Sequence, residues 1–277
     1  ALGYGDVTAI LQLVNKIQSP FKSMSSLVPQ AFAVTASAER LIEFYELSDE
    51  KNSGDELPDN FYDKFREIVF DNVTFRYSDD SVISGINMRI KKGECVVVAG
   101  ESGVGKSTAL KLLLGIMSPE SGKIYLSADS RNYTIGKNTR KLFSYVPQGN
   151  LILSGTIREN ICFASPDSGE EDIIHAAKVA QIWDFISSLD DGLDTKLGEK
   201  GMGLSEGQAQ RISIARAILY DAPILLLDES TSALDSHTEA ELLKAIQSMT
   251  EKTCIIVSHK QAAFDICDNV CYVTKNK

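Results

Sequence analysis

The sequence predicts an α/β domain built on a parallel sheet and preceded by a helical extension. From residue 65 onward, short apolar runs of strand length alternate with stretches of helical period, which is the pattern of strand–helix–strand units. One run, 94–99, is rich in valine and leads through a glycine-rich loop, 100–108, into an apolar helical stretch that ends at Gly115. A strand, a glycine loop and a helix in this order are typical of a parallel sheet whose loops hold a ligand.

Residues 1–47 are predicted to be mostly helical. The segment 7–17 is apolar around much of a helix, Pro20 and Pro29 are expected to interrupt the helix, and 36–45 resumes the helical period. Taken alone, this extension could be a packed helical hairpin or the end of a membrane helix that runs into the cytosol.

Polar and helix-breaking residues fill 48–64, which predicts a linker before a globular domain that begins at Phe65. In that domain, 67–77 alternates apolar residues with a period of two, as an antiparallel strand does, and 83–92 is expected to be its hairpin partner. A mainly helical insert is expected between about 150 and 220. Further strands are expected at 124–126, 142–146, 224–227, 253–257 and 270–273.

Composition and charge limit the classes of function. Hydrophobic residues make up 43% of the chain, which is enough for a sizeable core. The 28 Lys and Arg residues are outnumbered by 38 Asp and Glu residues, and this argues against a nucleic-acid partner, which requires a basic face. The five cysteines form no CxxC pair, so we expect free thiols in a reducing compartment.

The sequence has the marks of a fragment. It opens at Ala1 without a methionine and stops at Lys277 directly after a predicted strand. Within it, no apolar run approaches the length that crosses a bilayer, and no stretch resembles a signal peptide. We therefore expect the chain to come from a longer protein.

The glycine-rich loop fits a phosphate-binding pattern, a glycine, four residues and then Gly-Lys-Ser. Such a loop aims backbone N–H groups and a helix N-terminus at one point, which suits a phosphate chain. Lys106 would reach the β- and γ-phosphates, and the Ser107 hydroxyl would bind Mg²⁺. The alternative is a plain glycine-rich turn. The flanking strand and helix favour a nucleoside triphosphate site.

Polar side chains follow the other predicted parallel strands, where ligands of such sheets bind. They are Gln148, the pair Asp228 and Glu229, and His259. Asp228 would be the carboxylate on the Mg²⁺ side and Glu229 the general base for an attacking water. Alternatively, Asp228 or Ser230 caps the following helix. His259 would either contact the γ-phosphate or the water, or be an ordinary polar residue at a strand end.

Two further signals stay open on spacing alone. Tyr77 is either the last core residue of its strand or an aromatic surface for a nucleotide base. Ser205 and Gln208 precede an amphipathic helix, 209–219, with the spacing of a capping box. The alternative for this second pair is a helix N-terminus that is offered to a phosphate.

Together these stretches resemble, over residues 65–277, the nucleotide-binding domain of an ATP-binding cassette (ABC) transporter of the exporter type. The segment Gly100–Thr108 matches the family's Walker A loop, Gln148 its Q-loop, Leu204–Gln208 its signature motif, Ile224–Glu229 its Walker B motif, Ser232–Asp235 its D-loop, His259 its switch histidine and Tyr77 its adenine-stacking aromatic residue. One departure is Glu206, where the family usually has glycine.

The resemblance implies a P-loop NTPase fold of the ABC type, with a mixed sheet core, an antiparallel β subdomain and a helical subdomain. It implies that ATP and Mg²⁺ are bound and that ATP is hydrolysed. Implied nucleotide contacts are Tyr77, Gly100, Ser102, Gly103, Gly105, Lys106, Ser107, Thr108, Ser205, Gly207, Gln208 and Asp235. Implied metal ligands are Ser107, Gln148 and Asp228, and implied catalytic residues are Glu229, His259 and Gln148.

The resemblance also implies partners. Two such domains, in a homodimer or a heterodimer, would clamp ATP between one chain's phosphate loop and the other's signature motif. The segments 195–201 and 1–47 resemble exporter features, a loop that contacts the membrane domain and the end of its last helix. A fused transmembrane domain and a place at the cytoplasmic face of a membrane, such as a bacterial plasma membrane, would follow. The alternatives are a soluble ABC ATPase and a nucleotide-binding module that does not hydrolyse ATP.

Overall fold

The computed structural model describes residues 3–46, 55–77, 80–129, 131–149, 151–198 and 203–273. The chain divides into two compact units, 1–51 and 52–277, and each is described by itself. Among these described residues, no helix combines the length and hydrophobicity that crossing a bilayer requires.

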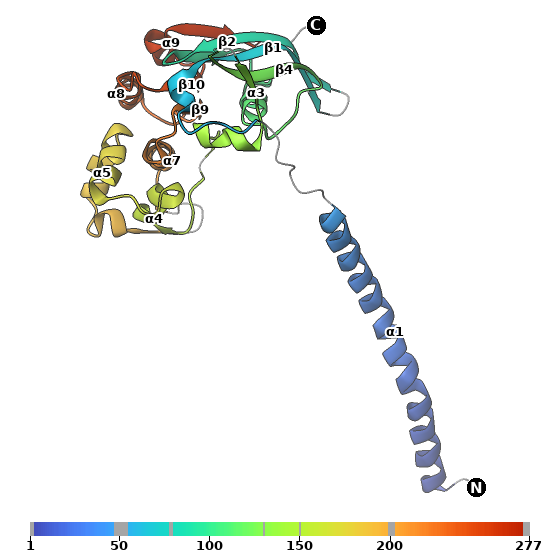
Figure 1. Ribbon diagram of the computed structural model, residues 1–277. Coiled ribbons are helices and arrows are strands. Elements are labelled where there is room, and N and C mark those ends of the chain that lie inside the picture. The colour runs from blue at the N-terminus through green and yellow to red at the C-terminus, as the bar shows by residue number, and fades with distance from the viewer. Residues whose placement is uncertain are drawn as a thin grey trace. The chain divides into compact units, whose positions relative to one another are not determined.

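The first unit is one helix, α1 (Tyr4–Glu46), which continues through both prolines (Figure 1). The predicted interruption at Pro20 and Pro29 is therefore wrong. A proline removes only its own N–H donor and crowds one preceding carbonyl, so the hydrogen bonds of the neighbouring residues still carry the helix across it. Apolar side chains such as Phe21 and Phe32, 69% and 72% exposed, have no covering element within this unit.

An antiparallel sheet opens the second unit, in the strand order β2-β1-β4-β5. Its long hairpin joins β1 (Phe65–Tyr77) to β2 (Asp80–Lys91), which confirms the predicted pairing. On its other side β1 pairs with β4 (Ser121–Ala128), and β4 pairs with β5 (Arg131–Thr134), a strand that the sequence pattern did not predict.

A parallel sheet carries the strand ends of interest, in the order β11-β3-β10-β9-β6. Its inner strands β3, β9 and β10 are buried on both faces, and they are accordingly continuous apolar runs, whereas the edge strand β11 is exposed or half-buried. The five strands are β3 (Cys95–Ala99), β6 (Phe143–Val146), β9 (Ile224–Asp228), β10 (Thr253–Val257) and β11 (Asn269–Tyr272). The predicted parallel sheet is thus confirmed, and all its carboxyl ends lie at one edge.

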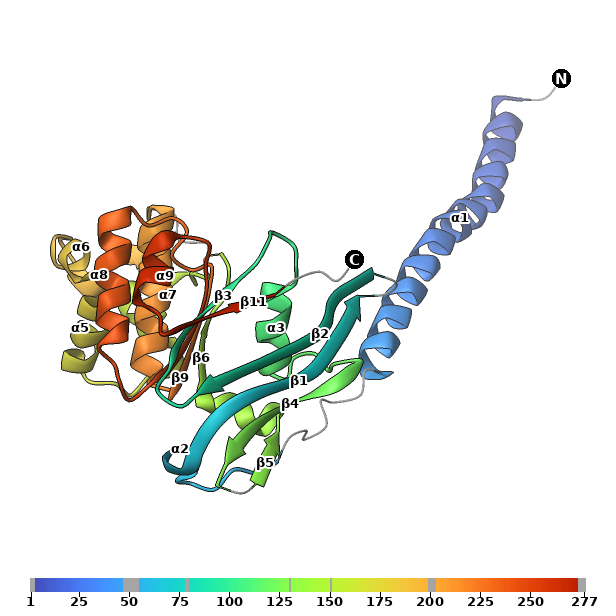
Figure 2. The ribbon, with the colours of Figure 1, turned by 90° about the horizontal axis from the view of Figure 1, so that it is seen from above.

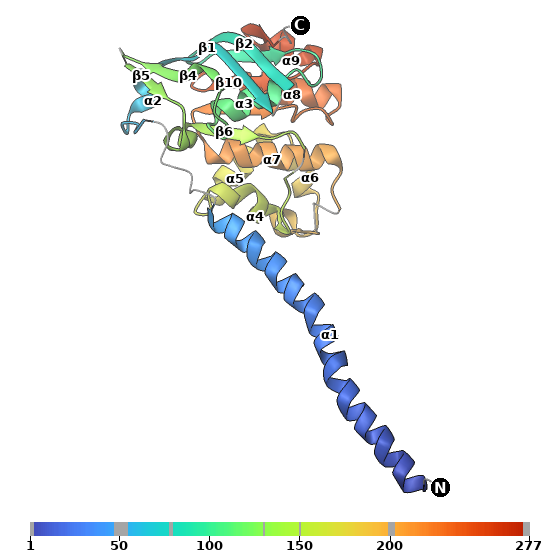
Figure 3. The same cartoon turned by 90° about the vertical axis from the view of Figure 1, so that its right-hand side faces the viewer.

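Helices cover both faces of the parallel sheet. Figure 2 shows α3 (Lys106–Leu113) between the two sheets, and α7 (Glu206–Tyr220) and α8 (Ser236–Gln247) on the opposite face. The expected helical insert contains α4 (Ile157–Ile161), α5 (Glu170–Val179) and α6 (Trp183–Ser187), and α7 lies between these short helices and β6 (Figure 3). The remaining elements are α9 (Gln261–Ile266), the 3-10 turns η1 (Lys137–Leu142), η2 (Cys162–Ala164) and η3 (Gly192–Asp194), and the short pair β7 (Gly155–Thr156) and β8 (Lys196–Leu197).

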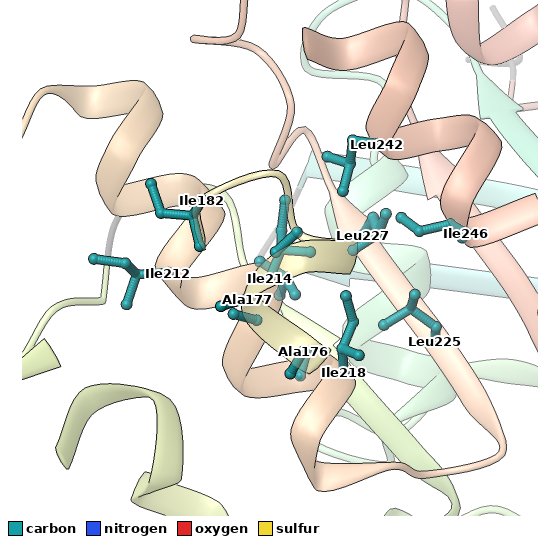
Figure 4. Close-up of a cluster of buried hydrophobic side chains, with 14 of the residues drawn as sticks. Ala176, Ala177, Ile182, Ile212, Ile214, Ile218, Leu225, Leu227, Leu242 and Ile246 are labelled. Atoms are coloured by element: carbon teal, nitrogen blue, oxygen red, sulfur yellow. The ribbon is translucent and has the colours of Figure 1, made fainter. Parts of the chain in front are cut away.

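Alternate residues of each parallel strand enter two separate cores. Val97 and Leu227 pack with the helices α5, α7 and α8, and Figure 4 shows that cluster around Ile214 of α7. Val98 and Leu226 pack instead with α3 and the antiparallel sheet. Because both faces of the sheet are filled, its carboxyl edge is a fixed platform for the residues that follow each strand.

The expected linker, 48–64, is partly folded. Its first residues lie outside the described part of the chain, but 61–64 form the short helix α2 (Phe61–Lys64). The Phe61 side chain is 2% exposed and packs edge-on against Tyr133 of β5, with ring centroids 5.0 Å apart. Phe61 thus anchors this polar stretch to the antiparallel sheet, together with Asp55, which exchanges hydrogen bonds with Thr134 of β5.

Candidate nucleotide-binding site

The glycine-rich loop follows β3 and requires glycine at two positions. Gly100 has φ +155°, and a Cβ there would collide with the carbonyl oxygen of Val273. Gly105 has φ +101° and precedes the first residue of α3, where a Cβ would lie 2.9 Å from side-chain carbons of Val82 and Ile83. Both positions combine a left-handed backbone with a close neighbour, so only glycine fits them.

Lys106 places its ammonium group inside this loop. The side chain is 6% exposed, and Nζ donates hydrogen bonds of 3.0 Å to the carbonyl oxygens of Gly100 and Glu101. The same nitrogen lies 3.9 Å from Oε1 of Glu229. A buried cation is thus held by neutral carbonyls, with one carboxylate close by.

Asp228 ends β9 and faces α3. Its Oδ1 accepts a 2.9 Å hydrogen bond from the Ser107 hydroxyl, and its Oδ2 accepts a 3.1 Å bond from the Tyr145 hydroxyl. Burial raises the pKa of Asp228, and the hydrogen bonds from Ser107 and Tyr145 offset only part of that shift. Burial and the neighbouring Asp228 carboxylate also raise the pKa of Tyr145, so this phenol remains a donor at neutral pH.

Glu229 holds an uncommon backbone conformation for a residue with a side chain. Its φ is +49°, and its N–H donates to the Val257 carbonyl at the end of β10. The carboxylate accepts a 2.7 Å hydrogen bond from Nε2 of Gln148. Left-handed backbone at a polar residue costs free energy and is frequent at functional sites.

Four strand ends therefore supply one cluster. Glu229 contacts both Lys106 and Gln148 at the distances given above, and Ser107 contacts Asp228. His259, which follows β10, is exposed and lines a small cavity together with Glu229. Ser102 and Gly103 lie exposed on the loop, and Thr108 is buried in α3.

The residues at the start of α7 form a second group. Ser205 Oγ accepts from the Gln208 N–H, and Gln208 Oε1 accepts from the Ser205 N–H, so the capping box is present. Gly207 lies against the segment 230–235, because a Cβ would be 3.0 Å from the Ala233 carbonyl oxygen. No hydrogen bond among the described residues connects this group to the glycine-rich loop.

Asp235 and Glu206 are both exposed. Asp235 caps α8 by accepting from the N–H groups of His237 and Thr238, and the Thr238 hydrogen bonds hold its pKa below the ordinary value. Glu206 is the first residue of α7, where a carboxylate is favoured by the helix dipole. Its exposed position means that it need not crowd a neighbouring ligand.

Tyr77 is not a core residue. Its side chain is 43% exposed, its hydroxyl donates to Sδ of Met117 at 3.1 Å, and its ring meets Phe75 edge-on with centroids 4.9 Å apart. Tyr77 at the end of β1 is therefore partly accessible to a ligand.

A charged network that was not predicted from the sequence lies beside this cluster. Lys260 Nζ donates to the carbonyl oxygens of Thr231 and Leu234, and it pairs at 3.1 Å with Glu239, whose side chain is 3% exposed. Glu239 also accepts a 2.7 Å hydrogen bond from Thr231. The pattern of α8 predicts that a charged residue such as Glu239 faces solvent. The pair could have been found only by searching the sequence for a cation that pairs with Glu239.

Gln210 extends the same network to α7. This residue is 2% exposed; its Nε2 donates to Ser232 Oγ and its Oε1 accepts from the Ala233 N–H, both at 3.1 Å. The segment 230–235 between Glu229 and Asp235 is therefore fastened to α7, to α8 and to the residue after His259.

Replacing Lys260 by methionine is expected to lower the free energy of unfolding by about 2 to 3 kcal/mol. The substitution leaves the buried Glu239 carboxylate without its cation, and such losses are costly. Chemical denaturation monitored by circular dichroism would measure the change. The double substitution Lys260→Met with Glu239→Gln should recover part of it.

The matched control is Arg76→Met, which breaks a pair with Glu120 whose two side chains are 51% and 54% exposed. Exposed pairs contribute roughly 0 to 1 kcal/mol. Equal losses in the two single variants would contradict a structural role for the buried pair.

Comparison with known proteins agrees with this site. The family model described as "ABC transporter" matches residues 83–232, more than half of the chain. A probable ABC transporter ATP-binding/permease protein of Haemophilus influenzae is 41% identical over 256 residues, which are 91% of this chain and 45% of that protein. An ATP-dependent lipid A-core flippase of Vibrio parahaemolyticus is 34% identical over 274 residues, 97% of this chain and 46% of that protein.

Among solved structures, a bacterial Atm1-family ABC exporter with ATP bound aligns with a TM-score of 0.77 and 31% identity. The alignment covers 88% of this chain and 42% of that one. The chain spans about half the length of the curated relatives it matches. The family match, the glycine-rich loop and the cluster of strand ends together establish that this chain belongs to the ABC transporter family.

Proposed function

We propose that this chain is the ATP-binding and ATP-hydrolysing domain of an ABC exporter, at the cytoplasmic face of a membrane. Its relatives carry the words ATP-binding/permease and flippase in their names, and the similar structure is an exporter. The remaining half of such a protein would be a fused transmembrane domain, with α1 as the connection to it. Substrate export would be powered by ATP-driven association of two such domains.

The observation that carries the proposal is the contact of Lys106, Glu229 and Gln148 at one sheet edge, beside the Ser107–Asp228 pair. A glycine loop alone would support nucleotide binding. A carboxylate that is held next to the loop's lysine in a left-handed backbone supports hydrolysis as well.

The loop would bind the triphosphate. Lys106 now bonds to two neutral carbonyl oxygens, and charged phosphate oxygens form stronger hydrogen bonds with an ammonium group. Gly100, Ser102, Gly103, Gly105 and Thr108 belong to the loop or to the first turn of α3, and their N–H groups would contribute further donors. The exposed face of Tyr77 would stack on the adenine.

The oxygen atoms of the Ser107 and Asp228 side chains are suitable ligands for Mg²⁺. A hydroxyl and a carboxylate oxygen meet at 2.9 Å, and Mg²⁺ takes oxygen ligands, with few from the protein and others from phosphates and water. No group of three or more His, Cys, Asp or Glu among the described residues is arranged to hold a metal, which agrees with such a sparse site. Gln148 donates through Nε2 to Glu229, so its amide oxygen is a third candidate ligand. When bound, Mg²⁺ would neutralise phosphate charge.

Glu229 would accept the proton of the attacking water, with Gln148 and Lys106 holding its two carboxylate oxygens in place. His259, which lies near Glu229 at this edge, would orient that water or the γ-phosphate. Hydrolysis is favoured over a non-hydrolysing module because both residues are present. A net charge of −10 disfavours the soluble ABC ATPases that act on nucleic acid.

The test is release of inorganic phosphate from ATP by the 277-residue chain. Phosphate release that depends on Mg²⁺ and stops when the metal is removed with EDTA is the expected result. ATP that binds without any turnover in the presence of Mg²⁺ would refute the hydrolytic part of the proposal.

Substitution of Tyr77 by alanine is expected to weaken ATP binding roughly tenfold, the scale of one base–aromatic stack. Turnover at saturating ATP should be unchanged, because stacking acts equally in the ground and transition states. Titration with a fluorescent ATP analogue measures the affinity. Tyr220→Ala is the matched control, since Tyr220 is 38% exposed at the end of α7, and equal affinities in the two variants would leave Tyr77 without a binding role.

A further inference from the structure

Three thiols converge at the amino-terminal edge of the parallel sheet. Cys95 begins β3, Cys254 is its register partner on β10, and Cys267 follows α9. The Sγ atoms of Cys95 and Cys267 are 2.8 Å apart, although 172 residues separate them in sequence. This edge is opposite to the glycine-rich loop, which follows the other end of β3.

Backbone hydrogen bonds fix the three thiols in place. The Cys95 N–H donates to Oδ2 of Asp268 and the Asp268 N–H donates to the Cys95 carbonyl, both at 2.8 Å. The Cys254 N–H donates to the Glu94 carbonyl at 2.9 Å. Asp268, the residue after Cys267, is thus bonded to Cys95 once through its side chain and once through its main chain, and these two bonds keep the chain at Cys267 next to Cys95.

The cluster favours one ionised sulfur. Hydrogen bonds from Cys254 and Cys267 lower the pKa of Cys95, although burial and the charges of Asp268 and Glu94 oppose this. The same contacts with Cys95, together with burial, raise the pKa of both neighbours. A thiolate is the reactive form of cysteine, and a second thiol at contact distance can resolve its oxidation product.

We propose that Cys95 and Cys267 form an oxidation site at which a hydroperoxide closes a reversible disulfide. The Cys95 thiolate attacks one oxygen of hydrogen peroxide and the O–O bond breaks. The departing hydroxide takes up the proton that the thiol had released, so one water and a sulfenic acid on Cys95 result. The second thiol then attacks that sulfur, the S–O bond breaks and a second water leaves. Two electrons pass from the two sulfurs to the peroxide. Cys95 itself is buried, so the reagent would reach it past Cys267, whose side chain is only half-buried and is in contact with the Cys95 sulfur.

In the test, the folded 277-residue chain is treated with hydrogen peroxide and the remaining free thiols are blocked. The chain is then digested without reduction, and its disulfide-linked peptides are identified by mass spectrometry. The expected product is a single Cys95–Cys267 crosslink, with free thiols falling from five to three. Dithiothreitol should restore all five, because a disulfide is reversible whereas sulfinic and sulfonic acids are not.

The matched variants are Cys271→Ser and Cys162→Ser, which remove half-buried thiols outside the trio. Both should lose the same two thiols as the wild type, whereas Cys267→Ser should form no crosslink to residue 267 and should lose only the Cys95 thiol, as a sulfenic acid or a higher oxide. A wild-type map without the Cys95–Cys267 crosslink overturns the proposal, and this result needs no variant to fold. Equal thiol loss in Cys267→Ser and Cys271→Ser overturns the assigned pair.

Discussion

Replacement of Glu229 by glutamine is expected to slow phosphate release from ATP by about two to four orders of magnitude, the contribution of a positioned general base. ATP affinity should be retained, because glutamine keeps the size of the side chain and loses only the capacity to take a proton. Glu229 follows Asp228, accepts a 2.7 Å hydrogen bond from Gln148 and lies 3.9 Å from Lys106. A steady-state ATPase assay measures the effect.

Glu206→Gln is the matched control for that experiment. It removes one carboxylate from the exposed first turn of α7, at the position where this chain departs from the usual glycine. Turnover in this variant should stay within about twofold of wild type, since surface substitutions generally have small effects. Unchanged turnover in Glu229→Gln would remove Glu229 from the proposed chemistry.

The parallel sheet could be predicted because its strands are buried on both faces and bounded by turn residues. The runs 94–99, 224–227 and 253–257 correspond to β3, β9 and β10 within one residue at each end. Convergence of the residues after these strands also follows from topology, because parallel strands end at one edge. Their roles toward ATP stay predictions.

Contacts between distant segments could not be predicted from local pattern. In the sequence, Lys260 and Glu239 each resemble a charged residue that faces solvent. Their pairing depends on how the segment 230–235 folds, because Lys260 also bonds to that segment. Cys95 and Cys267 resemble isolated thiols for the same reason. The course of α1 through Pro20 is a different case. Helix propensity gives the free-energy cost of one proline, whereas the hydrogen bonds of all 43 residues together determine whether the helix continues.

The structure leaves two groups of site residues separate within one chain. Lys106, Asp228 and Glu229 form one group, and the exposed start of α7 with Asp235 forms the other. A triphosphate in the glycine-rich loop would have donors on one side only. A second copy related by a two-fold axis would bring its Ser205 region to the other side and receive the same in return, as an isologous contact requires.

ATP is therefore expected to convert the chain from monomer to a symmetric dimer, and Glu229→Gln should make that dimer long-lived by preventing loss of the bridging γ-phosphate. Bound triphosphate would connect two surfaces of an acidic chain that otherwise repel each other. Sedimentation of the Glu229→Gln protein with and without ATP is the measurement.

Ser205→Arg should abolish the dimer and leave ATP binding by the monomer unchanged. Loss of the helix cap should lower the free energy of unfolding by about 1 kcal/mol. Ser248→Arg, at the exposed end of α8, is the matched control and should still dimerise. Glu229→Gln protein that remains monomeric at saturating ATP and tens of micromolar chain would exclude this arrangement for the chain alone, because the composite site would then supply too little binding free energy to join two copies.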